Sequence, residues 1–439
     1  CTYPLTDIGA PDGYAYTDPI NFRIDADTRD VYILNDDGTE EIADNRTVYI
    51  SDAKINLNVA KVDMLSGESV AGAKFRIVDA DGTVVVSWTS RDKADSIDTS
   101  TLKAGDPEYL AANADYKKYA EYTIQEVEPP VGYEKAADVT FAIDGDGKMY
   151  NVTVDENGQK QYELFTVTVG GVYINLIKVL DEPKLKISKV DIMGKEVPKA
   201  TLTIYAKDGS VDFEPITWST GETVGEPKYI SKNVFTPNIE YVLEETVAPN
   251  GYAYAHNITF YFDEDGMLYV DGVPMDGSRK INMVDESINV VVSKQDEESL
   301  NEIKGASLAI RDSKGEAIYT FESDVRPTLL PSDLFVAEKG KLSYYTLEEL
   351  IAPEGYLMAA PVKFAIDEYG VIYIADENGE YKPATATNGT VVMKDARDPD
   401  YSNKIKGPNT GDNMPIIPIA ILCIAALGGI ILIIRRKLV

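Results

Sequence analysis

The strongest constraint on how this chain can fold is a short stretch that occurs four times along it. In each copy a tyrosine begins a strand-like run, an acid follows four residues later, and a turn containing Pro-x-Gly-Tyr ends the run. The acids of the four copies are Asp7, Glu126, Glu245 and Glu349. Repetition at a regular period predicts an array of one structural module, so the repeat is interpreted before any single residue.

The residues around each copy indicate strands rather than helices. The chain of 439 residues contains 28 tyrosines and is rich in valine, isoleucine and threonine, the residue types that favour strands. Apolar and polar residues alternate in short runs, and turns rich in glycine and aspartate separate these runs. We therefore predict an all-β fold of tandem β-sandwich modules.

The spacing of the repeats predicts the order of the domains. Residues 1–52 resemble the C-terminal part of a truncated module, and three complete modules are expected to follow, at 53–182, 183–287 and 288–398. The first complete module has an insert around residues 95–120, which could include a short helix.

The C-terminal region differs in composition from the modules. Residues 399–413 form a polar linker, and Pro415 to Ile434 is an uncharged run followed by a basic tail. A run of this length fits one membrane span, and the terminal cations fit a cytoplasmic end. We predict a single transmembrane helix within 414–439.

Composition excludes several classes of function. A net charge of −31 argues against nucleic acid, whose phosphates would be repelled. Cys1 and Cys423 are the only cysteines, and neither can link the repeats.

The hairpin tips, such as the one ending at Gly147, resemble part of a calcium loop, but the downstream glutamate and the ligand spacing of that loop are missing. The single histidine, His256, has no nucleophile or metal cluster beside it in sequence. We therefore expect no metal, no cofactor and no enzymatic turnover.

Three residues recur in the same order in every complete module. A lysine interrupts the apolar run of the opening strand, the glutamate of the repeated stretch follows, and an aspartate closes the last strand. The three sets are Lys61/Glu126/Asp181, Lys189/Glu245/Asp285 and Lys294/Glu349/Asp395.

This recurring set predicts a covalent cross-link. If the side chains point into the sandwich, burial lowers the pKa of the lysine and raises that of the carboxyl groups, so that both partners become neutral. A neutral amine beside a protonated aspartic acid is a nucleophile beside an electrophile, and the glutamate can shuttle protons between them. The product would be an amide formed with loss of water. The alternative is a surface ion pair with no covalent bond.

Several motifs together point to a family. Lys-Val-Asp, Gly-Ala-Lys-Phe, Tyr-x-Leu-x-Glu, Ala-Pro-x-Gly-Tyr and the closing Val-Asp resemble the collagen-adhesin B-type, or SpaA-like prealbumin-fold, domains of Gram-positive surface proteins and pilins. The resemblance implies a prealbumin-like (Ig-like) sandwich with an isopeptide bond between lysine and Asp or Asn, assisted by the glutamate. Asn175 lies near the end of the first module and leaves its acceptor open. In residues 1–52, Asp52 matches the acceptor, but the lysine is missing and Asp7 replaces the glutamate.

The C-terminus resembles a second known signal. Gly407-Pro-Asn-Thr410-Gly411 before an apolar run and a basic tail is similar to a cell-wall sorting signal of the Leu-Pro-x-Thr-Gly type, with Gly407 in place of the leucine. The resemblance implies that a sortase cleaves between Thr410 and Gly411 and joins Thr410 to a peptidoglycan precursor or to another pilin subunit. The protein is then expected at the cell surface, anchored to the wall after a transient stay in the membrane.

These observations favour a structural function. The leading hypothesis is a wall-anchored stalk or pilin-like subunit that carries force. One alternative is an adhesin that binds host or matrix ligands through a missing N-terminal region or through the insert at 95–120. Another is the stalk of a truncated surface enzyme.

Overall fold

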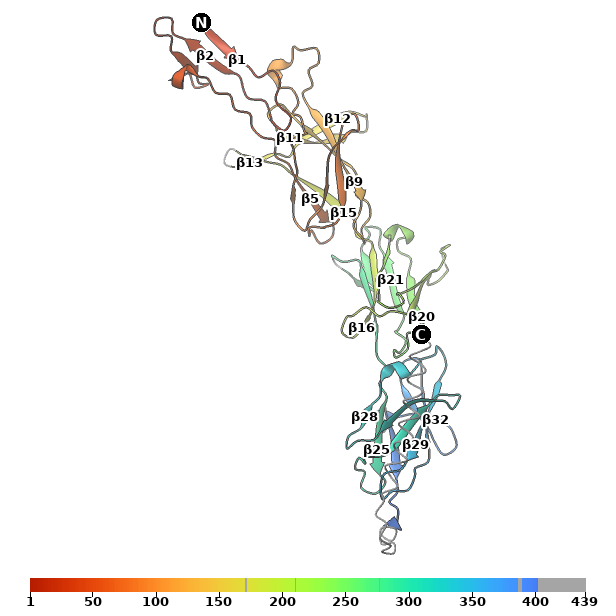
Figure 1. Ribbon diagram of the computed structural model, residues 1–439. Coiled ribbons are helices and arrows are strands. Elements are labelled where there is room, and N and C mark those ends of the chain that lie inside the picture. The colour runs from red at the N-terminus through yellow and green to blue at the C-terminus, as the bar shows by residue number, and fades with distance from the viewer. Residues whose placement is uncertain (170–171, 210, 276, 386–388, 402–439) are drawn as a thin grey trace. The chain divides into compact units, whose positions relative to one another are not determined.

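The computed structural model describes residues 1–401, apart from 170–171, 210, 276 and 386–388 (Figure 1). Strands make up the regular structure of this part, together with four short 3-10 helices, so the predicted all-β fold is confirmed. The chain divides into two compact units, residues 1–287 and the part that begins at Ile288. No helix among residues 1–401 is long and apolar enough to cross a membrane. The predicted membrane span and the sorting motif at Thr410 and Gly411 lie outside the described residues.

The first module consists of two sheets, formed by the strands from β5 to β15. The small sheet contains, in spatial order, β15 (Leu176–Asp181), β5 (Asn58–Asp63) and β8 (Asp95–Ser96). The large sheet contains β12 (Lys160–Leu164), β11 (Met149–Val154), β10 (Val139–Ile143), β9 (Ala120–Glu128), β6 (Lys74–Asp79) and β7 (Val84–Thr89). A separate hairpin pairs β13 (Val167–Val169) with β14 (Val172–Ile174).

The second module repeats this arrangement with the strands from β16 to β24. Its small sheet contains β19 (Lys228–Ile230), β16 (Leu185–Asp191) and β24 (Lys280–Asp285). Its large sheet contains β18 (Ile216–Ser219), β17 (Thr201–Ala206), β20 (Tyr241–Val247), β21 (Ile258–Phe262), β22 (Leu268–Val270) and β23 (Val273–Pro274). The 3-10 helix η3 (Lys232–Val234) follows β19.

The third module is formed by the strands from β25 to β33. Its small sheet contains β28 (Thr328–Leu329), β25 (Val291–Asp296) and β33 (Thr390–Asp395). Its large sheet contains β27 (Ala317–Glu322), β26 (Ser307–Arg311), β29 (Ser343–Ile351), β30 (Val362–Ile366), β31 (Ile372–Ala375) and β32 (Tyr381–Pro383). The 3-10 helix η4 (Ser332–Leu334) lies between β28 and β29.

The N-terminal copy, residues 1–52, forms one antiparallel sheet. Its strands are β1 (Thr2–Leu5), β2 (Ile20–Ile24), β3 (Val31–Leu34) and β4 (Glu40–Ile42), and the 3-10 helix η1 (Asp44–Arg46) follows. The repeated stretch places β1 in the position that β9, β20 and β29 occupy in the modules.

Each module has its own hydrophobic core between its two sheets. Phe75 and Phe141 are buried in the first module, Tyr241 and Phe260 in the second, and Phe364 in the third. Burying one such aromatic side chain stabilises a fold by about 1.5–3 kcal/mol. A core in every module explains how the repeats can fold without disulfides.

In every module the first strand and the last strand lie side by side and run parallel. β5 pairs with β15, β16 with β24, and β25 with β33, and β5 and β15 are labelled next to each other in Figure 1. The last strand is at the edge of its small sheet, so the first strand is its hydrogen-bonded neighbour there. The hydrogen bonds between these two strands therefore close the module.

The insert of the first module packs against the N-terminal copy. It contains the 3-10 helix η2 (Glu108–Leu110), and the Tyr109 hydroxyl donates a hydrogen bond to the Asp7 carbonyl at 3.0 Å. The Gly13 N–H donates to the Leu102 carbonyl at 2.7 Å. The short helix considered for this insert is thus present as a single 3-10 turn, and part of the insert is occupied by an intramolecular contact.

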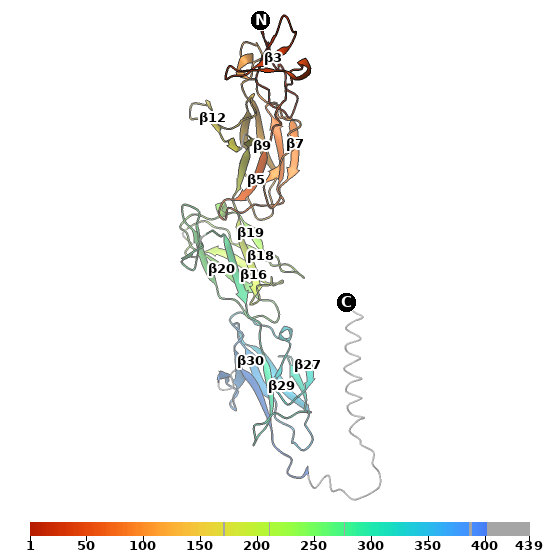
Figure 2. The ribbon, with the colours of Figure 1, turned by 90° about the vertical axis from the view of Figure 1, so that its left-hand side faces the viewer.

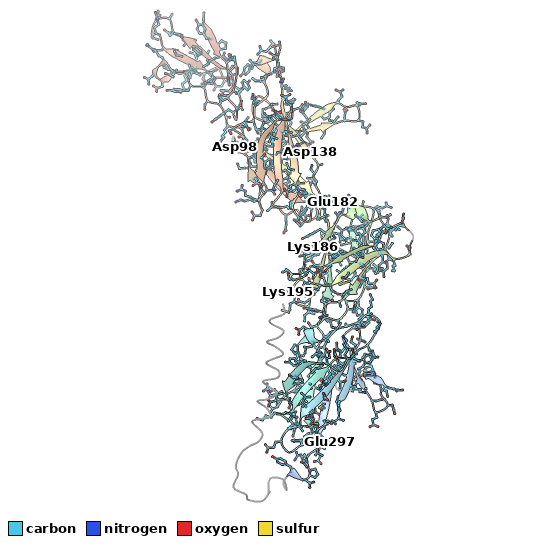
Figure 3. All side chains as sticks on the ribbon, turned by 45° about the vertical axis from the view of Figure 1, so that its right-hand side comes forward. Asp98, Asp138, Glu182, Lys186, Lys195 and Glu297 are labelled. Carbon is cyan, nitrogen blue, oxygen red and sulfur yellow. The ribbon has the colours of Figure 1, made fainter. Side chains whose placement is uncertain are left out.

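The segment that links the first two modules is held by a buried arginine. Arg279 Nη1 lies 2.9 Å from Glu182 Oε1, and the Arg279 side chain is only 3% exposed. Lys232 Nζ lies 2.8 Å from the same carboxylate oxygen. Glu182, labelled in Figure 3, directly follows the last residue of β15. The second module therefore binds the residue at which the chain leaves the first.

Candidate functional site

The lysine of each predicted set is fully buried. Lys61, Lys189 and Lys294 lie on β5, β16 and β25 and are at most 1% exposed. Side chains alternate between the two faces of a strand, and each lysine occupies a position that faces the sandwich interior. A buried ammonium group is costly unless acids surround it.

The aspartate of each set reaches the lysine because of the parallel register. Lys61 is opposite Val179, and Asp63 is opposite Asp181. Asp181 is therefore displaced from Lys61 by two positions, which places both side chains on the same face. Oδ1 of Asp181 contacts Nζ of Lys61. The same register gives the corresponding contacts in the other modules, between Lys189 and Asp285 and between Lys294 and Asp395.

The glutamate comes from the opposite sheet. β9, β20 and β29 are central strands of the large sheets, and β9 is seen beside β5 in Figure 2. Their glutamates cross the sandwich to the lysine: Nζ lies 2.7 Å from Glu126 Oε1 in the first module, 3.0 Å from Glu245 Oε2 in the second and 2.9 Å from Glu349 Oε1 in the third. The structure thus brings together all nine residues of the predicted sets, as three separate clusters.

Burial raises the pKa of each aspartate. Removal from water raises the pKa of Asp285 to about 7, although the contact with Lys189 lowers it in part. The pKa values of Asp181 and Asp395 rise to about 6 for the same reason, against contacts with Lys61 and Lys294. Burial also raises the pKa of Glu245. An aspartate with a raised pKa accepts the proton of the neighbouring lysine more readily.

This arrangement can form an amide bond. Moving one proton from lysine to aspartate converts an ion pair into a neutral amine beside a carboxylic acid, with no change in the number of bound protons. The lysine nitrogen can then attack the aspartate carboxyl carbon, and the glutamate can take a proton from nitrogen and deliver it to the departing hydroxyl. The C–N bond forms, the C–O bond breaks and water leaves. Two buried charges are removed in the process.

A backbone hydrogen bond holds each glutamate, and sequence reasoning did not identify it. The N–H of the alanine ten residues further along donates to glutamate Oε2 in every module: Ala136 to Glu126 at 2.6 Å, Ala255 to Glu245 at 2.8 Å and Ala359 to Glu349 at 2.7 Å. The sequence signal is Gly-Tyr-x-x-Ala, since each alanine stands three residues after the tyrosine of the repeated turn.

A β-bulge follows each glutamate directly. The pairing register shifts there, between Lys74 and Phe75 on β6, Thr201 and Leu202 on β17, and Ser307 and Leu308 on β26. The extra residues opposite these shifts are Val127, Thr246 and Leu350. A bulge bends the strand and redirects its side chains, so in each module the strand is distorted beside the acid that enters the cluster.

The repeated Pro-x-Gly-Tyr turn is bound to the end of the last strand. Its tyrosine forms an isolated β-bridge with the residue two positions after the acceptor: Tyr133 with Pro183, Tyr252 with Ser287 and Tyr356 with Arg397. The residue after each tyrosine also donates its N–H to the backbone carbonyl of the residue that follows the aspartate of the cluster. In the second module, Ala253 donates in this way to Glu286 at 2.9 Å. The turn therefore positions the strand that carries the aspartate.

The structure distinguishes the two acceptors considered for the first module. Asn175 is buried, but its Nδ2 donates to the Asn56 carbonyl at 2.7 Å and its Oδ1 accepts from Thr166 Oγ1 at 2.5 Å. Asp181 is the residue that contacts Lys61.

The N-terminal copy has the turn but a different arrangement of its acids. Tyr14 forms the equivalent bridge with Lys54, so the turn is bound to the segment after Asp52. Asp7 Oδ1 accepts from the Gly9 N–H at 3.0 Å, and Asp52 Oδ1 accepts from Thr17 Oγ1 at 2.9 Å. The two acids thus accept hydrogen bonds from Gly9 and Thr17 of the same copy, and Asp7 Oδ2 is buried without a hydrogen-bond partner.

The hairpin tips use their carboxylates for turn hydrogen bonds. Asp144 Oδ1 accepts from the N–H groups of Asp146 and Lys148, and Asp367 Oδ1 accepts from those of Tyr369 and Val371. Within residues 1–401, outside the gaps named above, no three His, Cys, Asp or Glu side chains are grouped so as to hold a metal ion.

The fold and the sites define a class of protein that is built of tandem β-sandwich modules, each with a buried lysine between two acids. More specifically, the chain belongs to the SpaA family, described as a prealbumin-like fold domain, which matches residues 55–158, 183–273 and 288–380, about two thirds of the sequence. No curated protein matches the chain in sequence.

Several solved structures are similar to this chain. The TIE protein of Bacillus anthracis is 18% identical, with 86% of this chain and 59% of that one covered and a TM-score of 0.23. The pilus adhesin SpaC from Lactobacillus rhamnosus GG is 14% identical, with 86% and 47% covered and a TM-score of 0.28. The shaft pilin SpaA from the same organism is 13% identical, with 48% and 96% covered and a TM-score of 0.21. The chain thus spans about half the length of the first two.

Proposed function

We propose that this protein is a structural cell-surface stalk or pilin-like subunit in which every module is closed by an intramolecular isopeptide bond. The bonds join Lys61 to Asp181, Lys189 to Asp285 and Lys294 to Asp395. The observation that carries the proposal is the threefold recurrence of one buried cluster, in which lysine on the first strand contacts aspartate on the last and glutamate from the opposite sheet. Keeping an ammonium group and two carboxylates charged in the core of each module is costly, whereas an amide is neutral.

The position of the bonds fits a protein that carries force. A pull on the two ends of the chain enters a module through its first strand and leaves through its last. These strands are parallel neighbours, and their hydrogen bonds are the contacts that such a pull would break. A covalent bond between the two strands would transmit the force from one to the other, so the rest of the module would not be unfolded by the pull.

We further propose that a sortase joins Thr410 to a peptidoglycan precursor or to another pilin subunit after cleaving before Gly411. The support is the sequence of this region, with its motif, apolar run and basic tail. Incubating the full chain with a sortase and an amine nucleophile should release the segment from Gly411 onward, and Thr410→Ala should abolish the release. Release from the variant at the same rate would contradict the proposed cleavage point.

The intact mass of the full chain under denaturing conditions tests the cross-links. We expect a mass three water molecules below the sequence value. Lys61→Ala, Lys189→Ala and Lys294→Ala should each restore one water, after correction for the substitution. Lys186→Ala is the matched control, because Lys186 lies on β16 with Lys189 but is partly exposed and outside the cluster. A mass equal to the sequence value would refute the proposed bonds.

A further inference from the structure

Resting on the proposed function, we infer that the backbone N–H three residues after the repeated tyrosine is a positioning group for bond formation. In each module this N–H belongs to Ala136, Ala255 or Ala359 and donates to the glutamate. We call it the glutamate clamp. The repeated turn then has two functions, since it holds the glutamate through the clamp and the acceptor strand through the tyrosine bridge.

One turn connects two groups of the cluster that lie on different sheets. In the second module, the Ala253 N–H donates to the Glu286 carbonyl, directly after the acceptor, and the Ala255 N–H donates to Glu245. Two hydrogen bonds, 2.9 and 2.8 Å long and two residues apart, thus fix the positions of Asp285 and Glu245 relative to each other. Small errors in position cost large factors in rate when groups must react at close range.

The N-terminal copy differs from the modules at the clamp position. It retains the turn and the tyrosine bridge, and its Ala15 N–H donates to the Ala53 carbonyl. The residue at the clamp position is Thr17, and the acid Asp7 is shorter than glutamate by one methylene group. Asp7 Oδ1 accepts from the Gly9 N–H instead, two residues away. The turn can therefore bind the last strand without the clamp. The clamp is seen in the three modules that have the lysine.

The clamp also affects the charge of the glutamate. Burial raises the pKa of Glu245, whereas the Ala255 N–H and Lys189 act in the opposite direction. A hydrogen bond donated to a carboxylate favours its ionised form, which is the form that can accept a proton from the attacking nitrogen. Asp285 and Lys189 are the other ionisable groups that face this carboxylate.

The clamp holds the carboxylate as a whole. In the first and third modules the clamped atom is Oε2, and Oε1 lies nearest the lysine. In the second module Oε2 accepts from Ala255 and also lies 3.0 Å from Lys189 Nζ. In the reaction, glutamate takes one proton from nitrogen and returns one to the leaving hydroxyl, so it ends in the state in which it began.

The experiment replaces a single amide by an ester in the full chain. Cell-free synthesis with lactic acid at position 255 removes the clamp N–H and keeps the alanine side chain. The matched control is the same replacement at Ala253, which removes a hydrogen bond of similar length in the same turn that does not touch the glutamate. Samples are quenched with acid at intervals, and loss of water from the second module is followed by mass spectrometry of its peptides.

We expect the ester at 255 to slow bond formation in the second module roughly ten- to hundred-fold, the factor for losing a hydrogen bond to a charged group. The pKa of Glu245 should rise without the donor, so the acid limb of the rate profile should move to higher pH. The ester at 253 should not move this limb, and the other two modules should react as in the parent chain.

Two outcomes would overturn the inference: equal slowing by both esters with no shift of the pH profile, or parental rates with the ester at 255. If the parent chain itself never loses water, the proposed function fails instead. Hydrogen exchange of the second module shows whether each ester variant folds. If the variant with the ester at 255 does not fold, the test is repeated in the third module. There the ester at 359 removes the N–H that donates to Glu349, and the control ester at 357 removes the N–H that donates to the Ala396 carbonyl.

Discussion

At the scale of single residues, the three clusters depend on where one proton resides. With lysine charged and aspartate ionised, a cluster is an ion pair. With the proton moved to aspartate, it is an amine beside an acid, which can react. The population of the second form relative to the first grows tenfold for each unit by which the pKa of aspartate approaches that of lysine. Burial of aspartate, which raises its pKa to about 6 or about 7, is therefore what would make the proposed bond accessible.

The pKa values predict how the reaction depends on pH. An extra proton on either acid of the cluster prevents the reaction, so the rate should rise with pH until both acids are ionised and then level. We expect the part of this rise that is due to aspartate to end near pH 7 in the second module and near pH 6 in the first and third. Newly synthesised chain, folded at a series of pH values and analysed by peptide mass, gives the three profiles. A rate that falls between pH 4 and 6 in all modules would contradict this account.

An unreacted module should lose stability as pH rises. Glu245→Gln removes the proton carrier and keeps Lys189 and Asp285. In the folded variant, burial still raises the pKa of Asp285 above its unfolded value of about 3.9. Between the unfolded and the raised folded pKa the folded state binds more protons, so the free energy of unfolding should decrease as pH rises from about 4 through the pKa of the folded variant.

Urea unfolding of the second module at several pH values measures this slope. The control is the double variant Glu245→Gln/Asp285→Asn, which has neither carboxyl group at this site. Equal slopes for the single and the double variant would show that Asp285 does not titrate abnormally.

At the scale of structural elements, the turn requires one special backbone conformation. Gly355 has a φ of 87°, in the left-handed region, and its counterparts in the other three copies are similar. A Cβ at Gly355 would meet nothing closer than 3.5 Å, so the cost of a side chain comes from the backbone conformation.

We therefore expect Gly355→Ala to destabilise the third module by about 1–2 kcal/mol. Gly355→Asn should cost less, because asparagine tolerates this region better. Denaturant unfolding in a Glu349→Gln background, without the bond, measures both. Alanine and asparagine variants as stable as the parent would mean that the turn can adopt another conformation.

Much of the site could be predicted from sequence, because its signals are local. An out-of-place lysine in an apolar strand, and acids at fixed positions in a repeat, identify Lys61, Glu126 and Asp181 without coordinates. The bulges could not be predicted, because a bulge is a mismatch between two strands and its extra residues, Val127, Thr246 and Leu350, share no side-chain type. The glutamate clamp was also missed, since a backbone N–H leaves no residue signature of its own.

At the scale of the whole molecule, the proposed cross-links predict how the chain responds to stretching. Lys189 and Asp285 are 96 residues apart in sequence, a segment that would extend by roughly 320 Å if it were pulled out. Single-molecule stretching of the full chain should show no step of this length for the second module, and Lys189→Ala should introduce one. Lys186→Ala should behave as the parent. A parent chain that shows such a step would not be cross-linked at this site.

The parallel pairing of first and last strands also has a topological consequence. A bond from Lys61 to Asp181 turns the intervening segment into a closed covalent ring, with the rest of the chain attached at its two joined residues. A protease that cuts once anywhere in this ring opens it without dividing the molecule. The hairpins of the three modules and the insert of the first all lie within such rings, whereas the hairpins of residues 1–52 lie outside them. Cleavage of an exposed loop in any of the three modules would therefore leave the stalk in one piece.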